Sequence, residues 1–277
     1  MVKGIYTATS GMMTVISDMN IKSNNISNLS TAGFKQDRLE ATTFAEALAI
    51  RQEIITSGKK YDIGSVTRGK KPLEVETDFS QGALQETLRS LDFAVAGDGF
   101  FVIQTADEFD EDDNPKGVYE GKYYTRNGQF QIDGEGYLID GLGNYVLDVD
   151  DDLILVERYD FVSDDFGNLF SADGEYITTL GIYNPRNPDY LVKTNEYPFV
   201  ILDEAISEIT NGDGDEELED MGFTGLIKQG YIERSNTDVA YQMAGLISAS
   251  RSFQSMSQII KAIDAIVGKS VNEVGRL

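Results

Sequence analysis

The sequence predicts an α+β protein with long helices at the two ends of the chain and an antiparallel all-β domain between them. Apolar residues near both ends recur at alternating spacings of three and four, which is the pattern of a coiled-coil seam. The middle is rich in Asn-Gly and Asp-Gly turn dipeptides and carries the acidic charge. We therefore expect the terminal helices to pair as a coiled-coil-like domain beside a separate β domain.

The first predicted helix runs from about residue 3 to residue 29 and would be on the order of 40 Å long, at about 1.5 Å per residue. Its seam, interrupted by Lys22, consists of Ile5, Ala8, Met12, Val15, Met19, Ile26 and Leu29. The polar stretch NNISNLSTAGFK occupies residues 24–35. Short polar side chains and Gly33 suit a helix end, but capping explains only one Asn and the glycine.

Residues 36–75 are expected to form a connector. Its start, RLEATTFAEALAIRQEI, can continue as helix, whereas TSGKKYDIGSVTRGKKP is typical of an exposed loop. Residues 76–227 are expected to form the β domain, because turn dipeptides separate strand-like triplets over 123–147 and 161–184. No helical run separates these strands, which argues against a βαβ sheet. The terminal helical domain would then comprise residues 1–35 and 228–277.

The second predicted helix begins near Ser235, Asn236 and Asp238, any of which can cap its first turn. Its seam carries Val239, Met243, Leu246, Phe253, Ile260, Val267, Val271 and Val274. A second apolar track runs through Ala240, Ala244, Ile247, Ala249, Met256, Ile259, Ile263 and Ile266. Because one partner helix cannot cover both tracks, we expect neighbours on several sides of this helix.

The net charge of −24 is unevenly distributed. Residues 1–35 and 228–277 each carry about +2, whereas residues 36–227 hold 14 basic and 42 acidic residues. An acidic middle argues against nucleic acid as a partner, because phosphates would be repelled. The acidic runs at 106–117 and 206–221 are expected as loop insertions on the β domain, and the sequence assigns them no role.

The composition excludes most catalytic chemistry. The chain has no Cys, His or Trp, which removes the common nucleophile, base and zinc ligands. Calcium-loop registers starting at Asp110, Asp148 or Asp213 fail because their sixth residue is not glycine. Asp92 and Asp98 flank apolar strands, but Asp98 suits a Gly-Asp-Gly turn better than a catalytic pair. We expect no catalytic residue, no cofactor and no metal.

The sequence contains no run of 18 apolar residues, which is about the length that a membrane-spanning helix needs. The first residues, MVKGIYTATSGMMTVISD, show no clear apolar signal core and no A-x-A cleavage site. We therefore expect no membrane insertion, and export, if it occurs, without a cleaved signal peptide.

Two long motifs resemble those of a known family. SNNISNLSTAGFK (23–35) is similar to the N-terminal signature of the axial proteins of the bacterial flagellum, the rod and hook proteins. QGYIERSNTDVAYQM (229–243) and SRSFQSMSQIIKAID (250–264) are similar to their C-terminal region. The stretches 79–103 and 123–147 also resemble rod and hook-basal-body proteins, so the resemblance covers most of the chain. It is strongest to the distal rod branch, with the proximal rod branch second.

The chain departs from the family pattern at two places. Tyr241 and Gln242 stand where the family generally has a pair of glutamates, so a salt bridge between subunits at this position is in doubt. The loops 106–117 and 206–221 are enlarged and acidic, which concerns only the outer surface.

The resemblance implies a structural subunit of the flagellar basal-body rod that self-assembles into a hollow helical tube, transmits torque and passes exported subunits. It implies terminal helices in the inner tube and the β domain outside. The implied partners are further copies of the chain, neighbouring rod, hook and ring proteins, and the flagellar type III export apparatus. The implied location is the basal body in the cell envelope.

In such a tube Asn24, Asn25, Asn28 and Thr31 would bond neighbouring copies and fix their register; Gly33 would turn the chain outward and Phe34 would anchor it. Local capping of the helix is the competing explanation for these residues. The expected assembly interface comprises Ile5, Ala8, Met12, Val15, Met19, Asn24, Asn25, Ile26, Asn28, Thr31, Gly33, Phe34, Ser235, Asn236, Asp238, Met243, Leu246, Arg251, Phe253, Gln254, Ile260 and Val267.

Three alternative functions stay open at this point. One is a hook-type axial protein of the same family. Another is a secreted, carboxylate-dependent cell-wall hydrolase, which would need two close acids in a cleft and would not need apolar seams at both ends. The third is a soluble adhesion or scaffold module, which would form a fixed small oligomer instead of an open helix.

Overall fold

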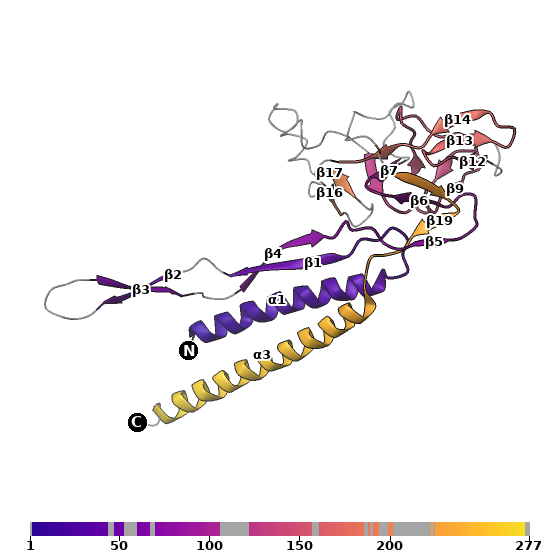
Figure 1. Cartoon of the computed structure of the whole chain (residues 1–277). Helices are drawn as coiled ribbons and strands as arrows, with labels where there is room; N and C mark the ends of the chain where they lie inside the picture. The colour runs from indigo at the N-terminus through magenta and orange to yellow at the C-terminus, as the bar shows by residue number, and fades with distance from the viewer. Residues whose placement is uncertain are drawn as a thin grey trace. The chain divides into compact units, whose positions relative to one another are not determined.

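The chain divides into two compact units in the computed structural model (Figure 1). The helical unit comprises Met1–Ser27, Asp37–Glu76 and Asp238–Leu277, and the β unit comprises Asn28–Gln36 and Thr77–Thr237. The structure describes residues 2–43, 47–52, 60–66, 70–105, 122–156, 161–185, 188, 191–193, 199–201, 223 and 225–274. A helix at each end and an antiparallel β middle are confirmed, and the acidic stretches 106–117 and 206–221 lie outside the described residues.

The helical unit combines two helices with four strands. They are α1 (Val2–Ser27), α3 (Val239–Val274), β1 (Asp37–Thr43), β2 (Ala47–Gln52), β3 (Lys60–Val66) and β4 (Lys70–Thr77). β1 pairs with β4, and β2 pairs antiparallel with β3. The helix that the start of the connector could continue is therefore replaced by strands β1 and β2. The expected exposed loop is also wrong in part, because that stretch contains β3 and the start of β4. Ala, Leu and Glu are among the strongest helix formers, but intrinsic propensity is small in energy, and pairing of extended backbone overrides it.

α1 and α3 contact each other in opposite directions. A Cβ on Gly4 would lie 3.7 Å from Ile263 Cδ1, and a Cβ on Gly11 would lie 3.1 Å from Met256 Sδ. The contact position therefore moves seven residues forward on α1 for seven residues backward on α3. Lys22 follows the same register, because its Cε would lie 2.6 Å from a Cβ on Gly245. The Lys22 ammonium also pairs with Asp18 one turn earlier on α1, at 2.7 Å.

The β unit consists of short strands in several small sheets. Its strands are β5 (Leu84–Glu86), β6 (Phe93–Ala96), β7 (Phe100–Gln104), β8 (Lys122–Thr125), β9 (Gln131–Ile132), β10 (Leu138–Ile139), β11 (Tyr145–Val146), β12 (Phe161–Ser163), β13 (Asn168–Ser171), β14 (Tyr176–Thr179), β15 (Ile182–Tyr183), β16 (Leu191–Val192), β17 (Val200–Ile201), β18 (Leu226–Gln229) and β19 (Tyr231–Glu233). The largest sheet has the order β15-β7-β11-β10-β9, with β8 also paired to β7. Smaller sheets are β12-β13-β14, β18-β6, β19-β5 and β16-β17, all antiparallel.

Aspartates form the hairpin turns of the β unit. In each of four turns the aspartate Oδ1 accepts the backbone N–H groups two and four residues later, at Asp133, Asp140, Asp148 and Asp164. Asp133, Asp140 and Asp164 connect β9–β10, β10–β11 and β12–β13, and the glycine three residues after each has a positive φ of 87–99°. Part of the acidic composition therefore stabilises turns.

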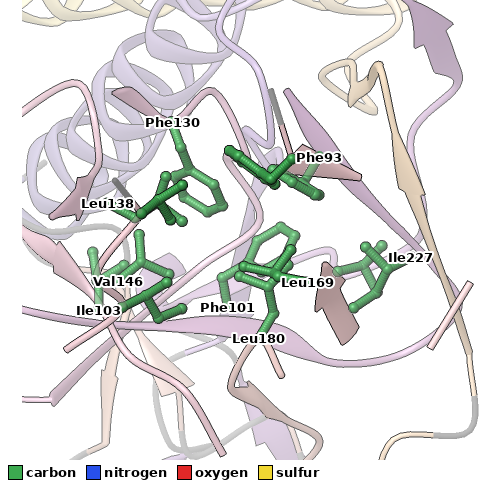
Figure 2. Packing of buried hydrophobic residues seen from close by; sticks show 13 residues of the cluster. Phe93, Phe101, Ile103, Phe130, Leu138, Val146, Leu169, Leu180 and Ile227 are labelled. Carbon is green, nitrogen blue, oxygen red and sulfur yellow. The ribbon is translucent and has the colours of Figure 1, made fainter. Parts of the chain in front are cut away.

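Strand β7 lies at the centre of the β unit and is buried on both faces. Phe101 and Ile103 belong to the larger apolar cluster, shown in Figure 2 with Phe130, Leu138, Leu169 and other residues. Phe100 and Val102 point to the opposite face and belong to a second cluster. This alternation follows from the two-residue period of a strand, and it explains why β7 reads as a continuous apolar run.

Candidate functional site

Two candidate regions are described, each within its own unit: the surface of the paired helices in the helical unit, and the segments after α1 and before α3 in the β unit. On α1 the expected seam residues Ala8, Met12, Val15, Met19 and Ile26 are half-buried. On α3 the less exposed residues again alternate at spacings of three and four, and they are Val239, Gln242, Leu246, Ala249, Phe253, Met256, Ile260, Ile263 and Val267. The α3 seam therefore combines positions from both apolar tracks.

Met243 departs from the expected seam. Its side chain is 50% exposed, whereas Gln242 is 3% exposed and Ala249 is 6% exposed. Gln242, which belongs to neither apolar track, therefore takes the seam position expected for Met243, and Ala249 of the second track is a seam position as well. Tyr241 is exposed on the same turn, as are Arg251 and Gln254 further along α3.

Large apolar side chains remain exposed on both helices after they pack against each other. On α1 these are Ile5, Tyr6, Met13 and Ile16, and on α3 they are Tyr241, Met243, Ile247, Ile259, Ile266 and Val271. Exposed apolar groups of this number on paired helices are typical of a surface that is buried by another molecule. Tyr6, Met13 and Ile16 were not among the expected interface residues.

Polar side chains at the end of α1 and just after it form hydrogen bonds within the chain. Asn25 is fully buried; its amide Nδ2 donates to Asp37 O at 2.8 Å, and its Oδ1 accepts Asp37 N–H at 3.0 Å. Thr31 Oγ1 donates to Asn28 Oδ1, and Thr31 N–H bonds Asn28 O. Asn24 and Thr31 are exposed. The Asn25 amide thus links α1 to the start of β1 within one protomer.

Gly33 and Phe34 are held in the β unit. Gly33 has the expected positive φ, at 69°, but α1 already ends at Ser27, so Gly33 does not cap that helix. A Cβ here would overlap the carbonyl carbon of Arg126. The Phe34 ring lies 4.1 Å from Lys193 Nζ, which also donates to Lys35 O at 2.6 Å. The half-buried Phe34 therefore packs against a cation of its own chain.

The side chains of Lys35, Arg126 and Glu233 form a buried charged cluster in the β unit. Glu233 Oε1 accepts Lys35 Nζ at 2.7 Å, and Glu233 Oε2 accepts Arg126 Nη1 at 3.3 Å. The side chains of Lys35 and Glu233 are 1% exposed, and that of Arg126 is 3% exposed. Burial lowers the pKa of Lys35, and the attraction of the Glu233 carboxylate opposes that shift. Spacing could not reveal this cluster, although Lys35 and Glu233 both lie in the motifs quoted above.

Of the three expected caps, Asp238 caps α3. Its Oδ1 accepts Tyr241 N–H at 3.1 Å, and its carbonyl accepts Gln242 N–H at 3.0 Å. Asn236 instead bridges segments of the β unit, because its Oδ1 accepts Gln36 N–H at 2.8 Å and its Nδ2 donates to Asp78 O at 2.8 Å. Ser235 Oγ bonds Thr237.

Within the described residues no three carboxylate, imidazole or thiolate groups gather where they could hold a metal ion. Asp148, the start of one calcium register, is committed to a turn and accepts Thr178 Oγ1 at 2.8 Å. Asp92 is buried beside the Arg89 guanidinium, at 3.5 Å. In the described part of the chain no helix combines the length and apolarity needed to cross a membrane.

Comparison with known proteins decides the family. Three family descriptions match: the flagella basal body rod protein over residues 5–35, the flagellar hook protein FlgE/F/G D1 domain over residues 94–210, and the flagellar basal body rod FlgEFG protein C-terminal region over residues 228–273. The flagellar basal-body rod protein FlgG of Bacillus subtilis is 31% identical over 285 residues, which cover 98% of this chain and 99% of the relative. The chain belongs to the flagellar basal-body rod protein family.

Other relatives agree over nearly the full length. The FlgG rod protein of Borreliella burgdorferi is 28% identical, with 98% of each chain covered, and the hook-basal body complex protein FlhO of Bacillus subtilis is 26% identical, with 100% of each chain covered. As a rod-family member the chain is a structural protein of the flagellar basal body and not an enzyme, which confirms the expected class. The hydrolase alternative finds no support.

Proposed function

We propose that this rod-family chain assembles with further copies of itself into a hollow helical tube that transmits torque and passes exported subunits. The terminal helices would form the inner tube, and residues 76–227 would form its outer part. The observation that carries the proposal is the set of exposed apolar side chains on α1 and α3, which one protomer leaves in water. Their burial between copies would favour assembly.

We further propose that α1 and α3 pair as a coiled coil. The half-buried positions alternate by three and four along both helices, and the constant register from Gly4–Ile263 to Lys22–Gly245 supports this pairing. Within the expected interface the seam residues would then act between the two helices of one copy. Contacts between copies fall to exposed positions such as Ile5, Met243, Arg251 and Gln254, together with Tyr6, Met13 and Ile16.

The proposed partners beyond other copies are the neighbouring rod, hook and ring proteins and the type III export apparatus, with the N-terminal segment as export address. The proposed place is the distal part of the rod, with the proximal part as the alternative. The chain length near 280 residues and the stretch 79–103 favour the distal position. Localising a tagged copy within isolated basal bodies would test this.

Electron microscopy of the concentrated full-length protein tests the central proposal. We expect open tubes whose length grows with protein concentration, because a heterologous contact that does not close generates a filament. A closed oligomer of fixed size, or a monomer at every concentration, would contradict it.

A further inference from the structure

The chain passes between the helical unit and the β unit four times, and one side chain joins two of the connecting segments. The first connection, residues 28–36, follows α1, and the second, residues 231–237, precedes α3. Gly33 N–H of the first donates to Glu233 O of the second at 2.8 Å. Lys35 Nζ of the first donates to the Glu233 carboxylate at 2.7 Å.

The same carboxylate also binds the body of the β unit. Glu233 Oε1 accepts Gly82 N–H at 2.7 Å, and Glu233 Oε2 accepts Arg126 Nη1 at 3.3 Å. Lys35 Nζ makes a second bond, to Ser80 O at 2.9 Å. Both glycines are required by packing, because a Cβ on Gly82 would overlap Arg234 O and one on Gly33 would overlap Arg126.

We infer that Glu233, with Lys35, Arg126 and Gly82, forms a rigid junction within the β unit that holds the segment after α1 and the segment before α3 at one point. The inference rests on the proposed function, in which load on the inner tube must reach the outer part. A buried carboxylate between two cations is a weak source of stability, because desolvation offsets most of the attraction. Its geometry is specific, however, and fixes the segments of Lys35, Gly82 and Arg126 to the segment of Glu233.

Two variants separate a positioning role of the cluster from a stabilising one. Neutralising the whole cluster, as K35M/R126M/E233Q, removes the buried charges but keeps the Gln Oε1 acceptor for Gly82 N–H. We expect the melting temperature of this variant to stay within ~4 °C of the parent, since replacing buried ions by apolar groups is often nearly neutral. The single variant Glu233→Gln leaves two buried cations without an anion, and we expect its melting temperature to fall by ~5–10 °C.

The decisive readout is amide hydrogen exchange at Gly33 and Gly82. We expect exchange to be at least ~10-fold faster in the neutral triple variant, because the connections are no longer held at one point. Lys122→Met is the matched control, because Lys122 also pairs with an acid at 2.7 Å, Asp151, but outside the connections. It should leave exchange at both glycines unchanged.

Assembly is measured separately, by sedimentation of polymer. In the neutral triple variant we expect the concentration needed for polymer to rise at least ~10-fold, while Lys122→Met polymerises like the parent. Parent-like exchange at Gly33 in the triple variant would overturn the junction. A parent that never polymerises would contradict the proposed function, and exchange would still decide the junction.

Discussion

Two isoleucines on α3 give the sharpest quantitative test of assembly through the terminal helices. Ile259 and Ile266 lie seven residues apart, therefore on one face, and are 50% and 56% exposed. Complete burial of an isoleucine contributes about 1.5–3 kcal/mol, so burying the remaining half contributes about 1 kcal/mol at each position. The double variant I259S/I266S should therefore weaken each subunit's addition by about 2 kcal/mol, or about 30-fold in the critical concentration.

The assay is sedimentation of polymer over a concentration series, with thermal unfolding of the monomer alongside. Serine and isoleucine have similar helix propensity, so monomer stability should change little. The control Q258S/A265S changes two exposed residues with the same spacing but little apolar area, and should raise the critical concentration by less than ~3-fold. If I259S/I266S assembles like this control, the exposed face of α3 does not drive assembly.

Three further predictions concern the fold. Gly33→Ala should cost at least ~3 kcal/mol of unfolding free energy, because its Cβ meets backbone, whereas Gly174→Ala, with positive φ but open space, should cost only ~1 kcal/mol; chemical denaturation separates the two. Asp238→Ala should destabilise α3 by about 1 kcal/mol, read by circular dichroism melting, and Asp238→Asn should restore most of that loss. Partial burial would raise the pKa of Asp164, but hydrogen bonds from the Asn168 side chain and from nearby backbone amides outweigh it and lower that pKa. Its stabilising contribution is therefore present above the ordinary pKa near 3.8 and lost as pH falls below it, so acid titration of unfolding should show a smaller loss in Asp164→Asn.

The helices and hairpins could be predicted because their signals are local. Asp-Gly and Gly-Asn dipeptides marked the turns of β9–β10–β11, where an aspartate bonds its own backbone. The Asn127-Gly128 dipeptide suggested a two-residue hairpin turn, which the structure does not have at this position. Instead, Gly128 O accepts Phe93 N–H, and a Cβ on Gly128 would overlap the Phe93 carbonyl. That glycine serves a close approach between strands rather than a hairpin loop.

Apolar spacing divided the seam residues of α3 between two tracks, whereas the structure combines positions from both tracks in one seam. Leu246, Phe253 and Ile260 are large and apolar, so their spacing was visible. The intervening positions include Gln242 and Ala249, whose burial depends on how closely α1 approaches. Apolar spacing cannot identify the amide Gln242 as a seam residue. It also cannot show which residues of two apolar tracks share one seam, because close packing of two helices selects residues by size as well.

The charged junction could not be predicted, because Lys35 and Glu233 are 198 residues apart. A lysine after a helix and a glutamate before another are ordinarily solvent-exposed. Likewise, Asn25 belonged to a stretch that suggested contacts between copies, whereas its amide bonds Asp37 of the same chain. Both contacts depend on the tertiary path of the chain, which the local pattern does not contain.

A helical reconstruction of the assembled protein by cryo-electron microscopy tests the proposed assembly most directly. We predict that α1 and α3 line an inner tube, with Ile259 and Ile266 buried against another copy and the β unit outside. Polymer in which these isoleucines face solvent, or in which contacts between β units alone join the copies, would contradict it.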